Sequence, residues 1–232
     1  MRKSRSISSY LTGQETAGGF AYLVFQLVFL PSILAWSNAR LEKPLNSAEL
    51  NFVFYMVNFI AMLLIFHDFL GRSASQACHH PAYFCQAVIL GFVAYYACSW
   101  AVTEVIRILV PSFSNYNDEA IAAMSKGNYF LMLVGTVVLV PPVEECFYRG
   151  LIFRSLYGKS RWGAYLASIL AFAIIHIIGY IGSYSALELL MAFLQYMPAG
   201  LCLAWAYTKA DTIFAPIFIH AAINFIAIHG LR

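Results

Sequence analysis

The sequence predicts an all-α, polytopic membrane protein, and both its composition and its apolar segments lead to this fold class. Of the 232 residues, 61% are hydrophobic and only 11% are charged. A soluble domain carries roughly 25% charged residues, so this chain cannot cover an ordinary aqueous surface. Apolar stretches of about 17–25 residues, the length that crosses a bilayer as a helix, recur along the chain. Helices are required because open strands would leave backbone groups unsatisfied in lipid.

The apolar segments define seven predicted spans in a single membrane domain, residues 1–232, and an eighth span or half-helix is compatible with the same pattern. The first segment follows a long polar lead and is longer than a signal-peptide core, so we expect it to be retained. Residues 111–127 form the longest connection and hold "PSFSNYNDEA", a polar turn able to open a helix. The predicted spans are Gly19–Trp36, Leu50–Leu70, Cys85–Val110, Asn128–Phe153, Gly163–Ile181, Leu187–Tyr207 and Thr212–Ile228.

The basic residues near the spans predict the orientation of the chain, because cytoplasmic loops carry an excess of Lys and Arg. Basic residues before the first span and after the fourth fall on one side when seven spans are drawn, and we expect that side to be cytoplasmic. Four others, Arg40, Lys43, Arg107 and Lys126, fall on or near the opposite side. The cytoplasmic set is Arg2, Lys3, Arg5, Arg154, Lys159 and Arg161.

The charge and the cysteines argue against binding of nucleic acid, a disulfide framework and a zinc-finger site. The formal net charge is +3 and basic residues form no long run, which does not favour binding of nucleic acid. The five cysteines are an odd number and lie mostly in or beside apolar segments, so they do not form a disulfide framework. The run Cys78–His80 has no second ligand pair at zinc-finger spacing, and we assign it no metal.

Ionisable residues inside predicted spans are costly, and each is a candidate for function. Some of them have simpler roles. Glu104 and Arg107 are three residues apart and suit an ion pair on one helix, and Glu188 opens a span, where a carboxylate favours the helix N-terminus. The full set is Glu104, Arg107, Glu144, Glu145, Arg149, His176, Glu188 and His220.

The stretch "VPPVEECFYRG", residues 140–150, places two glutamates and an arginine at the end of an apolar segment. If the helix continues past Pro142, Glu145 and Arg149 are four residues apart in the favourable order for an ion pair. Glu144 is rotated by about 100° from Glu145 on a regular helix. We therefore expect Glu145 to pair with Arg149 and Glu144 to face another partner.

Two histidines on other spans are available as that partner. His176 lies in "LAFAIIHIIGY", and His220 lies four residues before Asn224, which places the two on one helix face. Singly, each histidine would most simply form a hydrogen bond between helices. Together with Glu144 they are best explained by one polar cavity shared among three helices.

In chain order, "EECFYR", "FAIIH" and "HAAIN" fit the patterns E-E-x-x-x-R, F-x-x-x-H and H-x-x-x-N. This series resembles the three motifs of the CPBP family, which comprises CAAX prenyl proteases of the Ras-converting type and bacteriocin-processing or immunity (Abi) proteins. The resemblance covers residues 140–228. Residues 1–127 contain spans of the kind that vary in such families.

The resemblance implies an intramembrane endopeptidase whose site lies in a polar cavity. Glu144 would be the catalytic carboxylate, His176 and His220 its partners, and Asn224 would complete the site. Glu145 and Arg149 would brace the motif. The implied partners are a peptide or protein substrate at the membrane, such as a prenylated CAAX, leader or signalling peptide, and the lipid bilayer. The short chain with few loop insertions favours the prokaryotic branch of the family, and we expect the protein in the prokaryotic cell membrane.

Two mechanisms fit these residue types. In the first, which we favour, no cofactor is needed: Glu144 takes a proton from water, a histidine positions that water, and Asn224 donates to the oxyanion. In the second, Glu144, His176 and His220 bind zinc and leave a position open for water. The sequence lacks H-E-x-x-H, so the zinc alternative gains no support from that motif.

Two other function classes compete with proteolysis. One is a non-proteolytic membrane protein, such as an immunity factor that binds a partner. It does not require Glu144, His176, His220 and Asn224 together. The other is a proton-coupled transporter, which is disfavoured because the sequence shows no internal repeat and no matching pair of interrupted spans.

Overall fold

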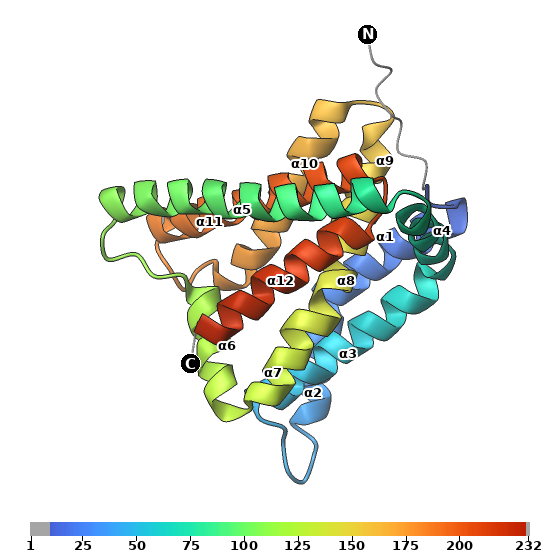
Figure 1. Cartoon of the computed structure of the whole chain (residues 1–232). Helices are drawn as coiled ribbons and strands as arrows, with labels where there is room; N and C mark the ends of the chain where they lie inside the picture. Colours follow the sequence, from blue (N-terminus) through green and yellow to red (C-terminus); the bar gives the residue numbers. More distant parts are fainter. Residues whose placement is uncertain (1–9, 231–232) are drawn as a thin grey trace.

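The computed structural model describes residues 10–230, and most of them lie in helices (Figure 1). Within these residues there is no strand, and one isolated bridge joins Ile181 to Tyr184. In chain order the elements are α1 (Gly13–Val28), α2 (Leu30–Asn38), α3 (Ser47–Ile65), α4 (His67–His79), α5 (Pro81–Leu109), α6 (Tyr116–Gly127), α7 (Tyr129–Val134), η1 (Gly135–Leu139), α8 (Val140–Glu145), η2 (Cys146–Phe153), α9 (Arg154–Tyr157), α10 (Arg161–Ile177), η3 (Ile178–Tyr180), α11 (Ala186–Ala210) and α12 (Phe214–Gly230).

The predicted helical membrane bundle is confirmed, and residues 10–230 contain five candidate spans, or six if a bent helix pair counts as one, where seven were predicted. Five segments are long and apolar enough to cross a membrane: Ser47–Ile65, Pro81–Leu109, Tyr129–Tyr157, Arg161–Tyr180 and Ala186–Ala210. The α1–α2 pair is bent by 45° and makes a sixth if it counts as one span. The apolar helix α12, which corresponds to the seventh predicted span, is shorter than these candidates. The predicted orientation depends in part on Arg2, Lys3 and Arg5, which lie outside the described residues.

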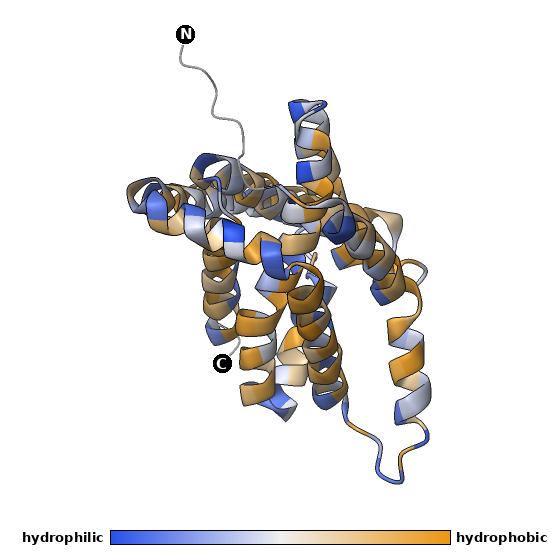
Figure 2. Cartoon of the chain, turned by 90° about the vertical axis from the view of Figure 1, so that its right-hand side faces the viewer, coloured by the Kyte–Doolittle hydropathy of each residue, from blue (hydrophilic) through white to orange (hydrophobic). Residues whose placement is uncertain are grey.

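Apolar residues predominate along most of the helices, as the extent of orange ribbon in Figure 2 shows, and many of them are exposed. Leu64, Ile108 and Trp162 are 77%, 74% and 87% exposed. A large continuous apolar surface is unfavourable in water and marks a membrane or partner surface. Together with the span lengths, this exposure fits a bundle whose outer surface faces lipid.

The second predicted span, Leu50–Leu70, ends five residues early. Helix α3 stops at Ile65, and the chain turns at Phe66 (φ −106°, ψ 18°) to begin α4. Phe66 and Phe69 are both fully buried in the core. The apolar residues after Ile65 therefore pack in the protein interior and do not face lipid. The sequence pattern alone could not distinguish these two environments.

Two structural assignments, made for three charged residues, are confirmed. Arg107 pairs with Glu104 at 2.5 Å on the surface of α5. At the start of α11, the Ser185 hydroxyl accepts from the Glu188 amide at 3.3 Å, and the Ser185 amide donates to the Glu188 carboxylate at 2.9 Å. This reciprocal arrangement is a capping box, which satisfies two backbone donors at a helix N-terminus.

The helix that carries the glutamates, residues 129–157, is continuous but not regular. It runs from α7 through the π-helical segment η1, the short α-helix α8 and a second π-helical segment, η2, into α9. Pro141 and Pro142 lack backbone N–H groups and cannot close the ordinary helical bonds to the preceding turn. The Val140 N–H instead reaches the Gly135 carbonyl, five residues back. Such wide turns often occur at functional sites.

Helices α1, α3, α10, α11 and α12 pack against this irregular helix (Figure 1). Helix α11 packs along both α5 and α10, and α12 crosses between the α5–α11 pair and the segment formed by η1 and α8. A Cβ atom on Gly200 would lie 2.9 Å from the Ile169 Cα, so glycine is required where α11 crosses α10. This close approach brings α10 and α12 within reach of the glutamates.

At the other end of the bundle, Glu15 joins α1 to α4. Its carboxylate is 6% exposed and accepts from the Phe69 amide at 2.6 Å, the Arg72 guanidinium at 2.6 Å and the Thr12 amide at 2.7 Å. A buried carboxylate is tolerated when charge-assisted hydrogen bonds replace its hydration. Glu15 therefore fixes the entry of the chain against the turn after α3.

We predict that Glu15→Ala lowers the free energy of unfolding by about 2–3 kcal/mol, because the Phe69 amide and Arg72 lose a charged acceptor. Thermal unfolding of the purified protein in detergent measures the change. Glu42→Ala is the matched control, since Glu42 is exposed in the α2–α3 connection. Equal unfolding temperatures for the two variants would contradict the bracing role.

Candidate functional site

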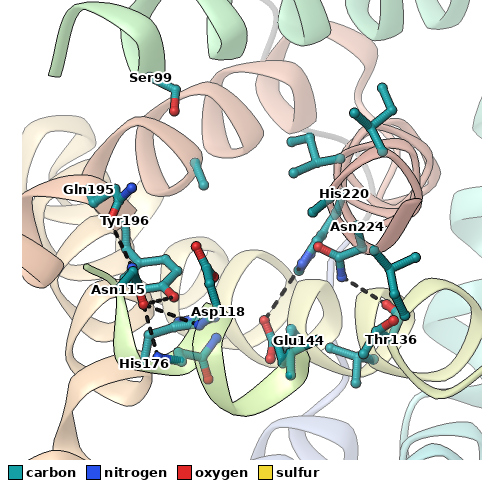
Figure 3. A pocket seen from close by; sticks show the side chains of 18 of the residues that line it. Ser99, Asn115, Asp118, Thr136, Glu144, His176, Gln195, Tyr196, His220 and Asn224 are labelled. Atoms are coloured by element: carbon teal, nitrogen blue, oxygen red, sulfur yellow. Dashed lines mark hydrogen bonds and ion pairs between the residues drawn. The ribbon is translucent and has the colours of Figure 1, made fainter. Parts of the chain in front are cut away.

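One cavity of about 540 Å³ brings together the four residues predicted to form the site (Figure 3). Glu144 comes from α8, His176 from α10, and His220 and Asn224 from α12. The predicted shared cavity is therefore present, and its volume is typical of ligand sites. Further polar groups on its wall are Tyr55, Tyr95, Ser99, Asn115, Asn117, Asp118, Thr136, Gln195 and Tyr196.

The predicted ion pair between Glu145 and Arg149 is present, with both side chains fully buried. Arg149 Nη1 donates to Glu145 Oε1 at 2.9 Å. The guanidinium also donates to the carbonyls of Ala199 (3.2 Å) and Gly200 (3.4 Å), and it lies 4.4 Å from the centre of the Phe172 ring. Arg149 thus joins η2 to α10 and α11, and a buried charge gains the partners that it needs.

We expected Glu145 to pair with Arg149 only and His220 to be a partner of Glu144. The expectation for His220 is wrong, because its close partner is Glu145. His220 Nδ1 donates to Glu145 Oε1 at 2.8 Å, whereas His220 Nε2 lies 4.0 Å from Glu144 Oε2. The reason is the crossing of α12 over α8, which places the near side of the imidazole against Glu145. Glu145 Oε1 therefore accepts from both Arg149 and His220.

This bond fixes the tautomer of His220. A carboxylate oxygen accepts hydrogen bonds, so the proton of the neutral ring is on Nδ1 and Nε2 is left as an acceptor. The free Nε2 points toward Glu144 in the cavity (Figure 3). A gap of 4.0 Å is too long for a direct hydrogen bond. It is short enough for one water molecule to bond to both groups.

His176 is held in a similar way. Its Nδ1 donates to the Phe172 carbonyl at 2.7 Å, which leaves Nε2 as the acceptor, and its ring stacks on Tyr196 with centroids 4.2 Å apart. His176 lines the same cavity as Glu144, and its short contacts are with Phe172 and Tyr196. The prediction that it faces the shared cavity is confirmed.

Asn224 has a specific backbone partner that the sequence did not reveal. Its side-chain amide donates to the Thr136 carbonyl at 2.8 Å. Five residues after Thr136 the chain has Pro141, which lacks an N–H, and the Val140 N–H is bonded to Gly135. Asn224 therefore supplies a donor that the proline pair removed from the helix, and this bond joins α12 to η1.

Glu144 differs from Glu145 in its surroundings. Its side chain is 23% exposed and lines the cavity, whereas Glu145 is fully buried. Within residues 10–230 the Oε2 atoms of both glutamates lack a hydrogen-bond partner. Glu144 also borders a second, mainly apolar cavity of about 400 Å³, whose wall includes Gln26, Phe54 and Phe147. Glu144 is thus a carboxylate with an unused acceptor at the junction of a polar and an apolar cavity.

Sequence reasoning missed the polar wall formed by α6 and α11. The Asn115 amide donates to Gln195 Oε1 at 2.8 Å, and Asn115 Oδ1 accepts from the Tyr196 hydroxyl at 3.2 Å. Asn115 also caps α6, which confirms that the polar turn opens a helix. Its place beside the cavity had no signal in the sequence, because the cavity forms only when α6 folds back beside α11.

Asp118, in the first turn of α6, carries a carboxylate on this wall. The surrounding protein desolvates the carboxyl group and raises its pKa above the ordinary value, and the Tyr196 hydroxyl offsets part of this rise. Asp118 as a whole residue is exposed to solvent.

The zinc alternative requires three ligands at metal-binding distances. Within the described part of the chain, no group of three or more His, Cys, Asp or Glu side chains is placed closely enough to hold a metal ion. As they stand, Glu144, His176 and His220 do not form such a ligand set.

Comparison with known families agrees with the motifs. Residues 126–226 match the family model described as Type II CAAX prenyl endopeptidase Rce1-like. We call these residues, which are similar to that family, the Rce1-like segment. The Rce1-like segment contains Glu144, Glu145, Arg149, His176, His220 and Asn224, whereas residues 1–125 lie outside it. The resemblance to CAAX proteases inferred from the sequence is confirmed.

A curated relative extends this comparison. The chain is 30% identical over 95 residues to a Bacillus subtilis (strain 168) protein named "Putative membrane peptidase YdiL". The alignment covers 40% of this chain and 34% of the relative, so the chain spans about a third of that protein's length. No solved structure gives a significant match.

The buried pair allows a double-mutant test. We predict that Arg149→Met costs about 3–5 kcal/mol in the free energy of unfolding, because Glu145 loses its cationic partner in the core. Arg149→Met combined with Glu145→Gln costs less than the two single changes added together, since the unpaired charge is removed. Unfolding of the three variants in lipid nanodiscs measures the coupling.

Arg107→Met is the control for this cycle. Its side chain is 70% exposed and pairs with Glu104 at the surface, where an ion pair contributes about 0–1 kcal/mol. A cost for Arg149→Met no larger than that of Arg107→Met would show that the Glu145–Arg149 pair does not hold the Rce1-like segment together.

Proposed function

We propose that this protein is an intramembrane endopeptidase in which Glu144 activates the attacking water. The observation that carries the proposal is the free Oε2 of Glu144, which lies 4.0 Å from the Nε2 of His220 in the polar cavity. A water between them would donate one hydrogen to Glu144 and the other to His220. This places a base beside a nucleophile that is already oriented.

Glu144 can carry out both proton transfers that peptide hydrolysis requires. Glu144 accepts a proton as the water oxygen adds to the substrate carbonyl carbon, and the new oxyanion needs hydrogen-bond donors. The protonated Glu144 returns the proton to the amide nitrogen as the peptide bond breaks. General base catalysis of this kind contributes roughly 10²–10⁴ in rate.

The remaining motif residues have supporting roles in this proposal. Glu145 accepts the Nδ1 hydrogen of neutral His220 and, with Arg149, fixes the ring. Asn224 donates one amide hydrogen to Thr136 and has a second that is available for the oxyanion. Loss of one oxyanion donor typically costs roughly 10²–10³ in rate. His176 would orient the peptide or water from the other side of the cavity.

The two cavities bordering Glu144 support a substrate with a polar and an apolar part. A peptide backbone suits the polar cavity, and an apolar side chain or lipid group suits the cavity beside Phe147. The Rce1-like segment makes a prenylated CAAX peptide the first substrate to test. Leader and signalling peptides from the membrane surface are the other classes.

Glu144→Gln should lower the rate of peptide cleavage by roughly 10²–10⁴ without loss of folding, because the amide cannot accept the proton from water. The test uses fluorogenic peptides, prenylated and unmodified, with the protein in lipid nanodiscs. The matched control is Glu104→Gln, which changes an acidic residue of α5 that does not line the cavity. Cleavage that survives Glu144→Gln would contradict the mechanism. An inactive wild type over both peptide sets would favour a binding or immunity role.

Metal removal separates the two mechanisms. If Glu144 acts on water directly, cleavage continues in excess EDTA and 1,10-phenanthroline, and elemental analysis finds far less than one zinc ion per chain. Zinc at one ion per chain, lost together with activity and restored with it, would instead make Glu144, His176 and His220 its ligands. The readouts are cleavage rate and metal content of the same samples.

A further inference from the structure

The wall of the cavity contributed by α6 and α11 has no role in the mechanism above. In Figure 3, Asn115, Gln195, Tyr196 and His176 lie on the left, Glu144, His220 and Asn224 lie on the right, and Asp118 lies between them. Asn115 and Asp118 precede residue 126, so they are outside the Rce1-like segment. Their presence on the wall is a property of this chain.

The charges that line the cavity are all negative. Asp118 and Glu144 are the acidic residues on its wall, and within residues 10–230 no Lys or Arg side chain lines it. Arg149 is buried behind Glu145, and the hydrogen bonds of His176 and His220 suit neutral rings. A site with this excess charge attracts a cation.

The position of Asp118 is fixed by its neighbours. Asn115 Oδ1 accepts from the backbone amides of Asn117 (3.0 Å) and Asp118 (3.4 Å) as well as from Tyr196. The Asn115 side chain is therefore fully used in holding the start of α6 against α11. The Asp118 carboxylate takes part in no ion pair with the described residues.

There is also room beyond Asp118. An adjoining cavity of about 500 Å³ shares Asn115, Asp118 and Gln195 with the first, and its wall adds Glu119. Arg107 lies on its wall but is paired with Glu104 at 2.5 Å. Tyr95 and Tyr196 line the first cavity, and aromatic faces contribute attraction for a cation. A long basic side chain therefore has space, a counter-charge and aromatic walls.

We propose that Asp118, with Tyr95 and Tyr196, forms a specificity subsite for a Lys or Arg side chain of the peptide substrate. This inference rests on the proposed peptidase function, because it describes the substrate of the same cavity. Asp118 selects the substrate and takes no part in the chemistry at Glu144.

The test separates binding from cleavage. Fluorescent peptides that differ at a single position, Lys, Gln or Glu, are titrated against the Glu144→Gln variant in nanodiscs, where Asp118 is the remaining carboxylate on the cavity wall. The variable position is moved along the peptide in a series. We expect the Lys peptide to bind at least about 10-fold more tightly than the Gln peptide at one or two positions.

Two changes of Asp118 and one control make the result specific. Asp118→Asn should bring the Lys-to-Gln ratio close to one, and Asp118→Lys should reverse the preference toward the Glu peptide. Asp68→Asn, which alters an exposed acid of α4, should leave the ratio unchanged. A role of Asp118 limited to stabilising α6 would lower binding of all three peptides alike and would overturn the proposal.

Cleavage assays with the wild-type protein distinguish the proposed peptidase function from the proposed Asp118 subsite. Cleavage of all three peptides at equal kcat/KM, together with equal binding, refutes the subsite and leaves the peptidase intact. A Lys preference in binding that depends on Asp118, without cleavage of any peptide, supports the subsite and refutes the peptidase. A Lys preference in both measurements supports both.

Discussion

The buried contact of Arg149 and His220 with a single oxygen of Glu145 is the interaction on which the site depends. Glu145 lies on α8, Arg149 on η2 and His220 on α12, and Arg149 also binds two carbonyls of α11. A carboxylate in this environment is stable only while its hydrogen-bond donors are present. The same group of bonds therefore holds four elements together and fixes which nitrogen of His220 faces the cavity. Support of the fold and orientation of the reactive group come from one set of contacts.

The irregular helix gives this network its geometry. Pro141 and Pro142 prevent regular α-helical bonding just before the glutamates, and the π-helical segments on either side of α8 absorb the disruption. This disruption leaves the Thr136 carbonyl without a donor from its own helix. The Asn224 side chain on α12 supplies the missing hydrogen bond. A residue that the family resemblance places in the site thus also repairs the backbone. In a regular helix without the proline pair, the Thr136 carbonyl would be bonded within the helix and would not need the contact with Asn224.

Glu144 has a distinct environment because the nearby hydrogen-bond donors bond to Glu145. Arg149 and the near side of His220 are both directed at Oε1 of Glu145, whereas Glu144 borders both the polar and the apolar cavity. Two adjacent residues of the same type therefore differ in burial and bonding because the helix rotates one toward the core and the other toward open space. In an enclosed cavity with few competing charges, an unpaired carboxylate interacts strongly with water or with a cation.

The sequence by itself determined the helical membrane fold, the ion pair of Glu145 with Arg149 and the gathering of Glu144, His176, His220 and Asn224 into one cavity. It could do so because hydrophobic length and i,i+4 spacing are local properties, and because isolated polar groups in apolar helices require one another. Only the tertiary structure decided that His220 bonds to Glu145 instead of Glu144, that Asn224 reaches Thr136, and that Asn115 and Asp118 line the cavity. Those contacts depend on how α6, α11 and α12 cross the irregular helix. The crossing is set by close approaches such as Gly200 against Ile169, which leave no periodic pattern in the sequence.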